Sequence, residues 1–269
     1  MTGNTLDGRT AFVTGSVQGI GLAVAKSLAA SGANVALHGL ASPEQAEIAM
    51  AEVRAAGASD VIFLDTDLSK AGAIDGMVKT LRDWREIDVL VNNAGIQKTT
   101  SIADATAEIW ESVLAVNLSA PFHVMRHLMP PMAERGFGRV VNIASVHGLV
   151  ASQNKAPYVS SKFGLVGLSR VAALEYASAG SRATGGVTVN CICPGWTETA
   201  IIEPQITARA AELGGDRDKG VASLLAEKQP SLRTSDPSEI GELCVWLCNK
   251  VAHNITGTSI PVDGGWTAQ

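Results

Sequence analysis

The chain has 269 residues, which is long enough to bury a full hydrophobic core and suits one large α/β domain, although two small domains remain possible on length alone. The formal net charge of −5 and a pI of about 5.6 give no basic face for nucleic acid or an anionic membrane, so we expect a small-molecule partner. The N-terminal stretch MTGNTLDGRTAFVTG has neither a signal-peptide pattern nor an apolar run that could span a bilayer, so we expect a cytoplasmic protein.

Short apolar runs alternate with longer helical patterns along the whole chain. Most of the runs are apolar throughout, which is typical of parallel strands that are buried on both faces. We expect strands at 10–14, 34–38, 61–65, 88–92, 139–144, 187–193 and 258–263. The sequence predicts an α/β fold, a doubly wound seven-stranded parallel sheet of Rossmann type with helices on both faces.

A glycine-rich turn follows the first expected strand and leads directly into a helix. The stretch VTGSVQGIG has the spacing TGxxxGxG, with its glycines at Gly15, Gly19 and Gly21. Glycines at these positions let the backbone approach a pyrophosphate, whose charge then lies at the helix N-terminus. The turn therefore indicates a dinucleotide site.

Two later strand ends belong to the same expected site. In DTDLS, the carboxylate of Asp67 could meet an adenine amino group and Leu68 could lie near the ring. In NNAG (92–95), Asn92 and the small residues leave room for the sugar to pass close to the backbone. The carboxyl ends of successive parallel strands meet at one edge of a sheet, which is where such folds bind dinucleotides.

The end of the second expected strand bears on which dinucleotide binds. It reads HGLAS, with neither the acidic residue common in NAD enzymes nor an Arg or Lys for the extra phosphate of NADP. His38 could be a weak phosphate ligand if it were protonated. Because no Lys or Arg lies in 33–42, we expect NAD.

Candidate catalytic groups lie around the fifth strand and the helix that follows it. A phenol has an ordinary pKa near ~10 and is a poor acid–base catalyst at neutral pH unless its phenolate is stabilised. Lys162 follows Tyr158 by one helical turn, so its ammonium can favour the phenolate. Ser145 ends the fifth strand, where its hydroxyl can polarise the substrate oxygen.

Further polar side chains around these groups would suit an anionic substrate. Lys155 and a protonated His147 lie between the serine and the tyrosine, and Gln97 and Gln205 can add amide donors. Together they could hold a small carboxylate in a fixed orientation. Gln205 belongs to 197–230, a helical segment that interrupts the strand–helix alternation and is expected to form a lid over the site.

The cysteines do not indicate a metal site. Cys191 and Cys193 alternate along an expected strand, and Cys244 and Cys248 lie one helical turn apart. No CxxC pair or histidine accompanies them at zinc spacing, so we expect four reduced thiols in the core and no bound metal.

The chain resembles the classical short-chain dehydrogenases/reductases over essentially its whole length. TGSVQGIG, NNAG, Asn117 in VNLSA, Ser145, YVSSK and PGW occur in the order and approximate spacing of that family. The resemblance implies one domain over 1–269 with 197–230 as its substrate lid, a nicotinamide cofactor, and usually a homotetramer. It also implies catalytic roles for Ser145, Tyr158 and Lys162, with Asn117 holding a water in the proton relay.

The same resemblance implies which residues contact the cofactor, with Lys162 binding the nicotinamide ribose. The expected contacts are Gly15, Ser16, Gln18, Gly19, Ile20, Gly21, Asp67, Leu68, Asn93, Ala94, Gly95, Tyr158, Lys162, Pro194, Gly195 and Thr199.

One subfamily, the bacterial D-3-hydroxybutyrate dehydrogenases, is similar in further positions and in the ending VDGGWTAQ. This similarity implies that Gln97, His147, Lys155 and Gln205 hold a carboxylate. It also implies that Trp196 and Trp266 bound a methyl group, beside Ser145 and Tyr158 as further substrate contacts. The chain departs from the subfamily at LHGLAS and at AGSRATGGVT, neither of which touches a catalytic position.

The expected function is therefore NAD-dependent, reversible oxidation of (R)-3-hydroxybutyrate to acetoacetate. Two alternatives remain open from the sequence. One is another dehydrogenase of the family, such as an NADPH-dependent 3-oxoacyl thioester reductase. The other is a protein without catalytic activity that senses a dinucleotide, against which the intact Ser145, Tyr158 and Lys162 set argues.

Overall fold

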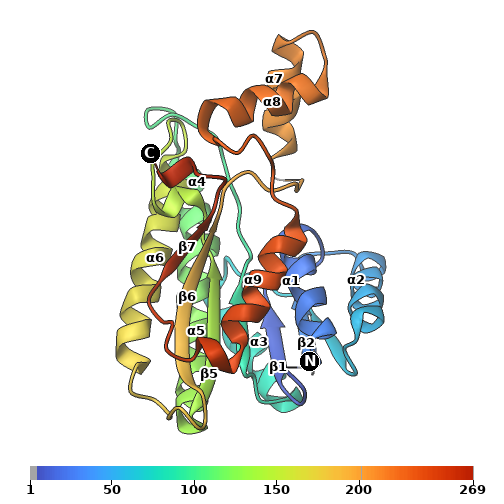
Figure 1. The fold of residues 1–269 in the computed structure, drawn as a ribbon, viewed down its shortest axis with the longest axis vertical. Helices are drawn as coiled ribbons and strands as arrows, with labels where there is room; N and C mark the ends of the chain where they lie inside the picture. The colour runs from blue at the N-terminus through green and yellow to red at the C-terminus, as the bar shows by residue number, and fades with distance from the viewer. Residues whose placement is uncertain (1–4, 201, 269) are drawn as a thin grey trace.

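The computed structural model describes residues 5–200 and 202–268, and its centre is a seven-stranded parallel sheet (Figure 1). Residues 1–4 and 269 of the expected domain, and residue 201 of the expected lid, lie outside the described residues. The strand order is β3-β2-β1-β4-β5-β6-β7. The strands are β1 (Thr10–Val13), β2 (Asn34–His38), β3 (Val61–Leu64), β4 (Val89–Asn92), β5 (Phe137–Ile143), β6 (Gly186–Pro194) and β7 (Ser259–Val262).

This sheet confirms the predicted fold class. The chain order reverses between β1 and β4, which makes their carboxyl ends the topological switch point where such sheets bind ligands. The expected strands agree with the observed ones to within one or two residues at each end. β5 begins earlier than expected because Phe137 and Gly138 pair with Gly186 and Val187 of β6.

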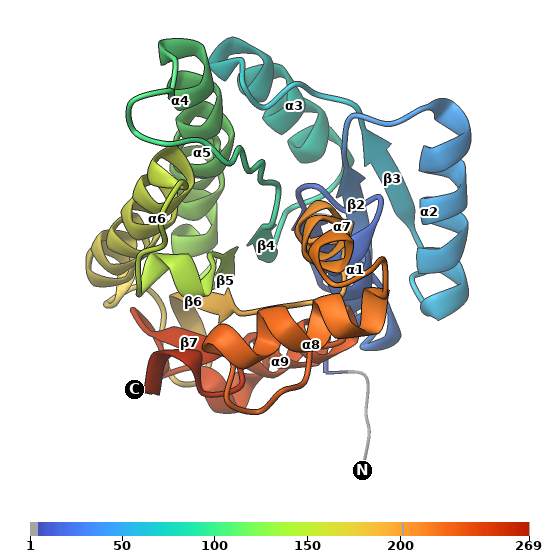
Figure 2. The same cartoon turned by 90° about the horizontal axis from the view of Figure 1, so that it is seen from above.

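Helices cover both faces of the sheet (Figure 2). One face packs against α1 (Gly19–Ala30), α2 (Pro43–Ala56) and α9 (Pro237–Cys248). The other packs against α3 (Ala71–Trp84), α5 (Ala120–Glu134) and α6 (Ala156–Tyr176). α4 (Ala107–Leu114) continues through a π-helical turn, Ala115–Ser119, into α5. No helix in the described part of the chain is both long and apolar enough to cross a membrane.

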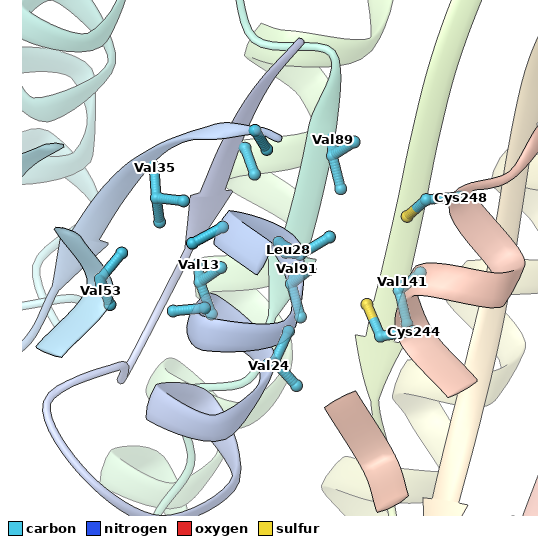
Figure 3. Close-up of a cluster of buried hydrophobic side chains, with 14 of the residues drawn as sticks. Val13, Val24, Leu28, Val35, Val53, Val89, Val91, Val141, Cys244 and Cys248 are labelled. Carbon is cyan, nitrogen blue, oxygen red and sulfur yellow. The ribbon is translucent and has the colours of Figure 1, made fainter. Parts of the chain in front are cut away.

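Two of the cysteines lie in the core between the sheet and α9. Cys244 and Cys248 project from α9 toward Val141 of the sheet, in the cluster that also holds Val13 and Val91 (Figure 3). Cys191 and Cys193 are buried on β6. All four are free, which confirms the prediction of unpaired core thiols.

Two helices stand above the carboxyl ends of the strands. α7 (Glu203–Glu212) and α8 (Arg217–Lys228) pack on each other and project beyond the sheet (Figures 1 and 2). They occupy most of the segment 197–230, between β6 and α9. They lie above the edge of the sheet where the ligand site is expected, which is the position required of the proposed lid.

A buried polar network ties α6 to the sheet. Asn92 of β4 donates through Nδ2 to Oδ1 of Asn142 on β5 at 2.7 Å, and Asn142 donates to Oγ of Ser169 on α6 at 2.7 Å. Ser169 in turn donates to the carbonyl of Leu165 at 2.6 Å. Asn92 is therefore engaged inside the sheet and does not reach a bound sugar. The network fixes the helix that carries Tyr158 and Lys162.

Removing the centre of this network should destabilise the protein. Asn142→Val leaves the Nδ2 donor of Asn92 buried without its partner, which costs about 1–3 kcal/mol. For a chain of this size, each kcal/mol lowers Tm by about 2–4 °C. Calorimetry should show that fall for the variant, whereas Ser160→Ala on the exposed face of α6 should leave Tm unchanged. Equal Tm values for the two variants would contradict this role.

Candidate active site

A cavity of about 420 Å³ opens at the carboxyl edge of the sheet. Its wall is built from the glycine turn before α1, the segments that follow β2 to β6, the start of α6, α7 and the C-terminal Trp266. A volume of this size is typical of a site for a small molecule or cofactor. The cavity therefore coincides with the expected dinucleotide and substrate sites.

The glycine turn offers the cavity free backbone donors. α1 begins at Gly19 and has no side-chain cap, so its first N–H groups remain open to an anion. Gly15 has φ +62°, and a Cβ there would lie 2.8 Å from Cα of Ala94. The turn can close on β4 only because this residue is glycine. Its shape and donors fit the pyrophosphate of a dinucleotide.

Most of the expected cofactor contacts line this cavity, but two lie behind its wall. Ser16 is fully buried, and its hydroxyl donates to the carbonyl of Val13 at 2.8 Å. A Cβ at Gly21 would lie 2.2 Å from the carbonyl oxygen of Gly15. These two residues shape the turn from behind. The cavity is lined by the other expected contacts: Gly15, Gln18, Gly19, Ile20, Asp67, Leu68, Asn93, Ala94, Gly95, Tyr158, Lys162, Pro194, Gly195 and Thr199.

The adenosine end contains an acidic residue and a histidine. The carboxylate of Asp67 accepts from the hydroxyl and the amide of Ser69 at 2.6 and 3.0 Å, and these bonds hold the pKa of Asp67 below its usual value. His38 is only 3% exposed, and burial lowers its pKa. Its Nδ1 accepts from the N–H of Gly15, so the ring is neutral. The condition under which His38 could bind a phosphate, a protonated ring, is therefore not met in this structure.

The candidate catalytic groups meet at the start of α6. Tyr158 and Ser145 both line the cavity, and the hydroxyl of Ser145 lies near enough to the phenol to affect its pKa. Nζ of Lys162 lies 5.7 Å from the centre of the Tyr158 ring and donates to the carbonyl of Ile143 at 2.8 Å. The structure thus brings the three groups together as predicted.

Burial dominates the acid–base properties of this set. It raises the pKa of Tyr158, while the hydrogen bond with Ser145 acts in the opposite direction. Burial also lowers the pKa of Lys162 to about 8, against the effect of the nearby Cys191 and Cys193. The pKa of Tyr158 therefore lies above its usual value in the protein alone, and the group that opposes burial is Ser145 rather than the expected Lys162.

Asn117 lies beside this set rather than in the cavity wall. It is buried in the π-helical turn, and its Nδ2 donates to the carbonyl of Ile96 at 3.0 Å and to Oγ of Ser161 at 3.1 Å. Its Oδ1 accepts from the N–H of Ile96 at 2.9 Å. Because both amide N–H groups are engaged, the side chain has no free donor for a water and instead fixes the segment after β4.

All the expected substrate contacts line the cavity: Gln97, Ser145, His147, Lys155, Tyr158, Trp196, Gln205 and Trp266. Nζ of Lys155, just before α6, donates to Oε1 of Gln205 on α7 at 3.1 Å. The rings of Trp196 and Trp266 stack with their centres 6.2 Å apart. The substrate end thus combines an ammonium and an amide with an aromatic surface.

His147 differs from its predicted state. Burial, and after it the charge of Lys155, lowers the pKa of His147 to about 4. The ring is therefore neutral near neutral pH, and the prediction of a protonated histidine is wrong for the protein alone. Nδ1 faces the carbonyl of Val150 at 3.3 Å and so carries the proton. Nε2 is then an acceptor, and the ring packs edge-on against Tyr158 and Trp266.

The sequence analysis missed Lys228, a second cation near the substrate end. It ends α8, and its Nζ lies 5.4 Å from the centre of the Trp266 ring. Burial lowers the pKa of Lys155, and the charge of Lys228 lowers it further; Lys228 is also the smallest of the causes that act on the pKa of His147. In the sequence, Lys228 stands in EKQP near the end of the expected lid. Nothing there distinguishes it from an ordinary surface lysine.

The chain matches the family model described as short chain dehydrogenase over residues 9–210. It is 43% identical to the D-beta-hydroxybutyrate dehydrogenase of Cupriavidus necator over 266 residues, 98% of this chain and 100% of that protein. It is 40% identical to the D-beta-hydroxybutyrate dehydrogenase of Rhizobium meliloti over 262 residues, 97% of this chain and 99% of that protein.

A solved structure supports the same assignment. L-sorbose reductase from Gluconobacter frateurii, complexed with NADPH and L-sorbose, matches with a TM-score of 0.91 at 28% identity, covering 100% of this chain and 99% of that chain. The family model, the two relatives and this structure agree with the motifs and the cavity, and the cofactor of the family is a nicotinamide dinucleotide. The chain belongs to the short-chain dehydrogenase family.

Proposed function

We propose that the protein oxidises (R)-3-hydroxybutyrate to acetoacetate with NAD, in a reversible reaction. The observation that carries this proposal is the pairing of Lys155 with Gln205 in the cavity that Tyr158 also lines, with Nζ of Lys155 6.0 Å from the centre of the Trp196 ring, which stacks on Trp266. An ammonium, an amide and a flat apolar surface suit a short acid with a small apolar end. The names of the two curated relatives support the same substrate.

The substrate would be held at both of its polar ends. Lys155 binds the carboxylate, and the amides of Gln97 and Gln205 complete its contacts. The hydroxyl faces Tyr158 and Ser145, which line the same part of the cavity. Trp196 and Trp266 enclose the methyl group. Because the carboxylate, the hydroxyl and the methyl group each have a fixed place, the site would accept one enantiomer of the alcohol.

Each residue of the catalytic set has one task in the oxidation. A bound nicotinamide would accept the hydride from the carbinol carbon. Tyr158 acts in its phenolate form, whose oxygen takes the hydroxyl proton to give the neutral phenol, and Ser145 holds the substrate oxygen by a hydrogen bond. Lys162 holds the nicotinamide ribose and places its ammonium near the phenol. α7 and α8 cover the cavity and keep water from the reacting atoms.

The adenosine end supports NAD over NADP. The described residues that line this end include Asp67, Leu40 and the neutral His38, and none of them is a lysine or arginine. Lys70 lies outside this wall and is paired with Asp67 at 3.3 Å, so no cation of the described wall is placed to bind a phosphate on the ribose. The relative solved with NADPH leaves this choice to experiment.

Replacing Lys155 with Ala should weaken the complex with the acid more than the complex with a neutral alcohol. Loss of a charge-assisted hydrogen bond costs about 1.5–3 kcal/mol, which is about a 10- to 150-fold fall in kcat/KM. Steady-state NADH absorbance with 3-hydroxybutyrate measures this fall. Lys98→Ala, an exposed lysine next to Gln97, is the matched control and should stay within about twofold. An equal fall for the acid and for a neutral alcohol would remove Lys155 from the carboxylate site.

Replacing Tyr158 with Phe should remove the acid–base group and leave the cofactor site formed. General acid–base catalysis contributes about 10²- to 10⁴-fold, so kcat should fall within that range. NADH binding, followed by fluorescence, should change little. Tyr176→Phe alters the other tyrosine of the chain and should keep full activity. The proposed mechanism fails if the Tyr158 variant binds NADH normally and turns over at nearly the parental rate.

Binding of the acid should not be accompanied by proton uptake at pH 7. A nearby carboxylate offsets the charge of Lys155, but burial is the larger cause of the low pKa of His147 and remains, so the ring stays neutral. Calorimetry of 3-hydroxybutyrate added to the NADH complex, a pair that cannot react, should give the same enthalpy in buffers of different ionisation enthalpy. Uptake approaching a full proton would instead make protonated His147 a ligand of the carboxylate.

A further inference from the structure

Hydrogen bonds from both its backbone and its ring join His38, the last residue of β2, to the glycine turn. The N–H of Gly15 donates to Nδ1 of His38 at 3.2 Å. The N–H of Ser16 donates to the carbonyl of His38 at 2.8 Å, and the N–H of His38 donates to Oγ of Ser16 at 3.0 Å. Only the first of these uses the side chain, so a substitution can remove it and leave the other two.

The second ring nitrogen reaches the next strand. Because a backbone N–H can only donate, Nδ1 must be the acceptor, and the proton of the neutral ring lies on Nε2. Nε2 then donates to the carbonyl of Thr66, just after β3, at 2.8 Å. The imidazole thus bridges the first glycine of the turn and the end of β3. His38, Gly15 and Thr66 all line the cavity.

Protonation would break this bridge. A proton on Nδ1 would face the N–H of Gly15, so that two donors would meet in a site where His38 is only 3% exposed. The ring of Phe12 on β1 packs edge-on against the imidazole of His38, with 6.3 Å between the two ring centres. Asp65, at the end of β3, is the charged group that acts on the ring and favours protonation, while burial opposes it more strongly.

We propose that His38 is a positioning residue of the dinucleotide site, which acts as a neutral bridge between Gly15 and Thr66 and selects against a phosphate on the adenosine ribose. Both ring nitrogens are engaged, so the side chain can offer a phosphate no N–H without losing one of its two partners. The inference rests on the proposed function, since NAD is the cofactor proposed there.

Two amide substitutions separate the halves of the bridge. In His38→Asn the amide oxygen occupies the place of Nδ1 and can still accept from Gly15, whereas in His38→Gln the amide reaches the place of Nε2 and leaves Gly15 without an acceptor. Calorimetric titration with NAD at pH 7.5 should give an affinity within about threefold of the parent for Asn. The affinity should fall about fivefold or more for Gln, because a buried donor loses its partner. Similar affinities for the two variants would overturn the proposal.

Titration of the unaltered protein tests the selection against phosphate without any substitution. NAD should bind at least about tenfold more tightly than NADP at pH 7.5. The ratio of the two affinities should not move toward NADP when the pH is lowered to 5.5. A gain of about tenfold for NADP would mean that a protonated His38 binds the phosphate, and would overturn the inference while leaving the dehydrogenase activity intact. A protein that binds neither dinucleotide overturns the proposed function, and this inference with it.

Discussion

The hydrogen bonds from Asn93 to the carbonyls of Thr14 and Gly15, at 3.0 and 2.8 Å, hold together the two strand ends on which the whole site is built. They close the glycine turn after β1 against the end of β4, at the point where the strand order reverses. The hydroxyl of Thr14 reinforces this junction by accepting from the N–H groups of Asn93 and Ala94 at 3.0 Å each. With the turn fixed in this way, the first N–H groups of α1 face the cavity rather than the core.

The two ends of the cavity differ in charge for a physical reason. At the substrate end, burial and then the charge of Lys228 lower the pKa of Lys155, and no carboxylate of the described cavity wall balances the two lysines there. A bound anion would offset this concentration of positive charge, which supports an acid over a neutral alcohol as substrate. At the adenosine end the described wall instead holds Asp67, which is paired with Lys70, and no lysine or arginine.

The sequence predicted the elements and their order because each depends on local pattern. Apolar runs marked the strands, and the spacing of Gly15, Tyr158 and Lys162 located groups that the fold does bring to one cavity. What it could not supply are relations between distant segments. The protonation of His38 and His147 depends chiefly on how deeply the tertiary fold buries each ring, and for His38 also on the N–H of Gly15 from another strand end. Ser16 and Asn117 likewise lie in turns whose packing directs their side chains to partners inside the protein and away from the cavity.

The proposed function requires one cavity to hold a hydroxy acid with its carboxylate at Lys155 and its hydroxyl at Tyr158. A crystal structure of the complex with NADH and 3-hydroxybutyrate would show whether it does, because these two compounds cannot react with each other. The carboxylate should lie within hydrogen-bonding distance of Lys155 and Gln205, and the hydroxyl at Tyr158 and Ser145. An acid bound in the reverse orientation, or outside the wall formed by Trp196 and Trp266, would contradict it.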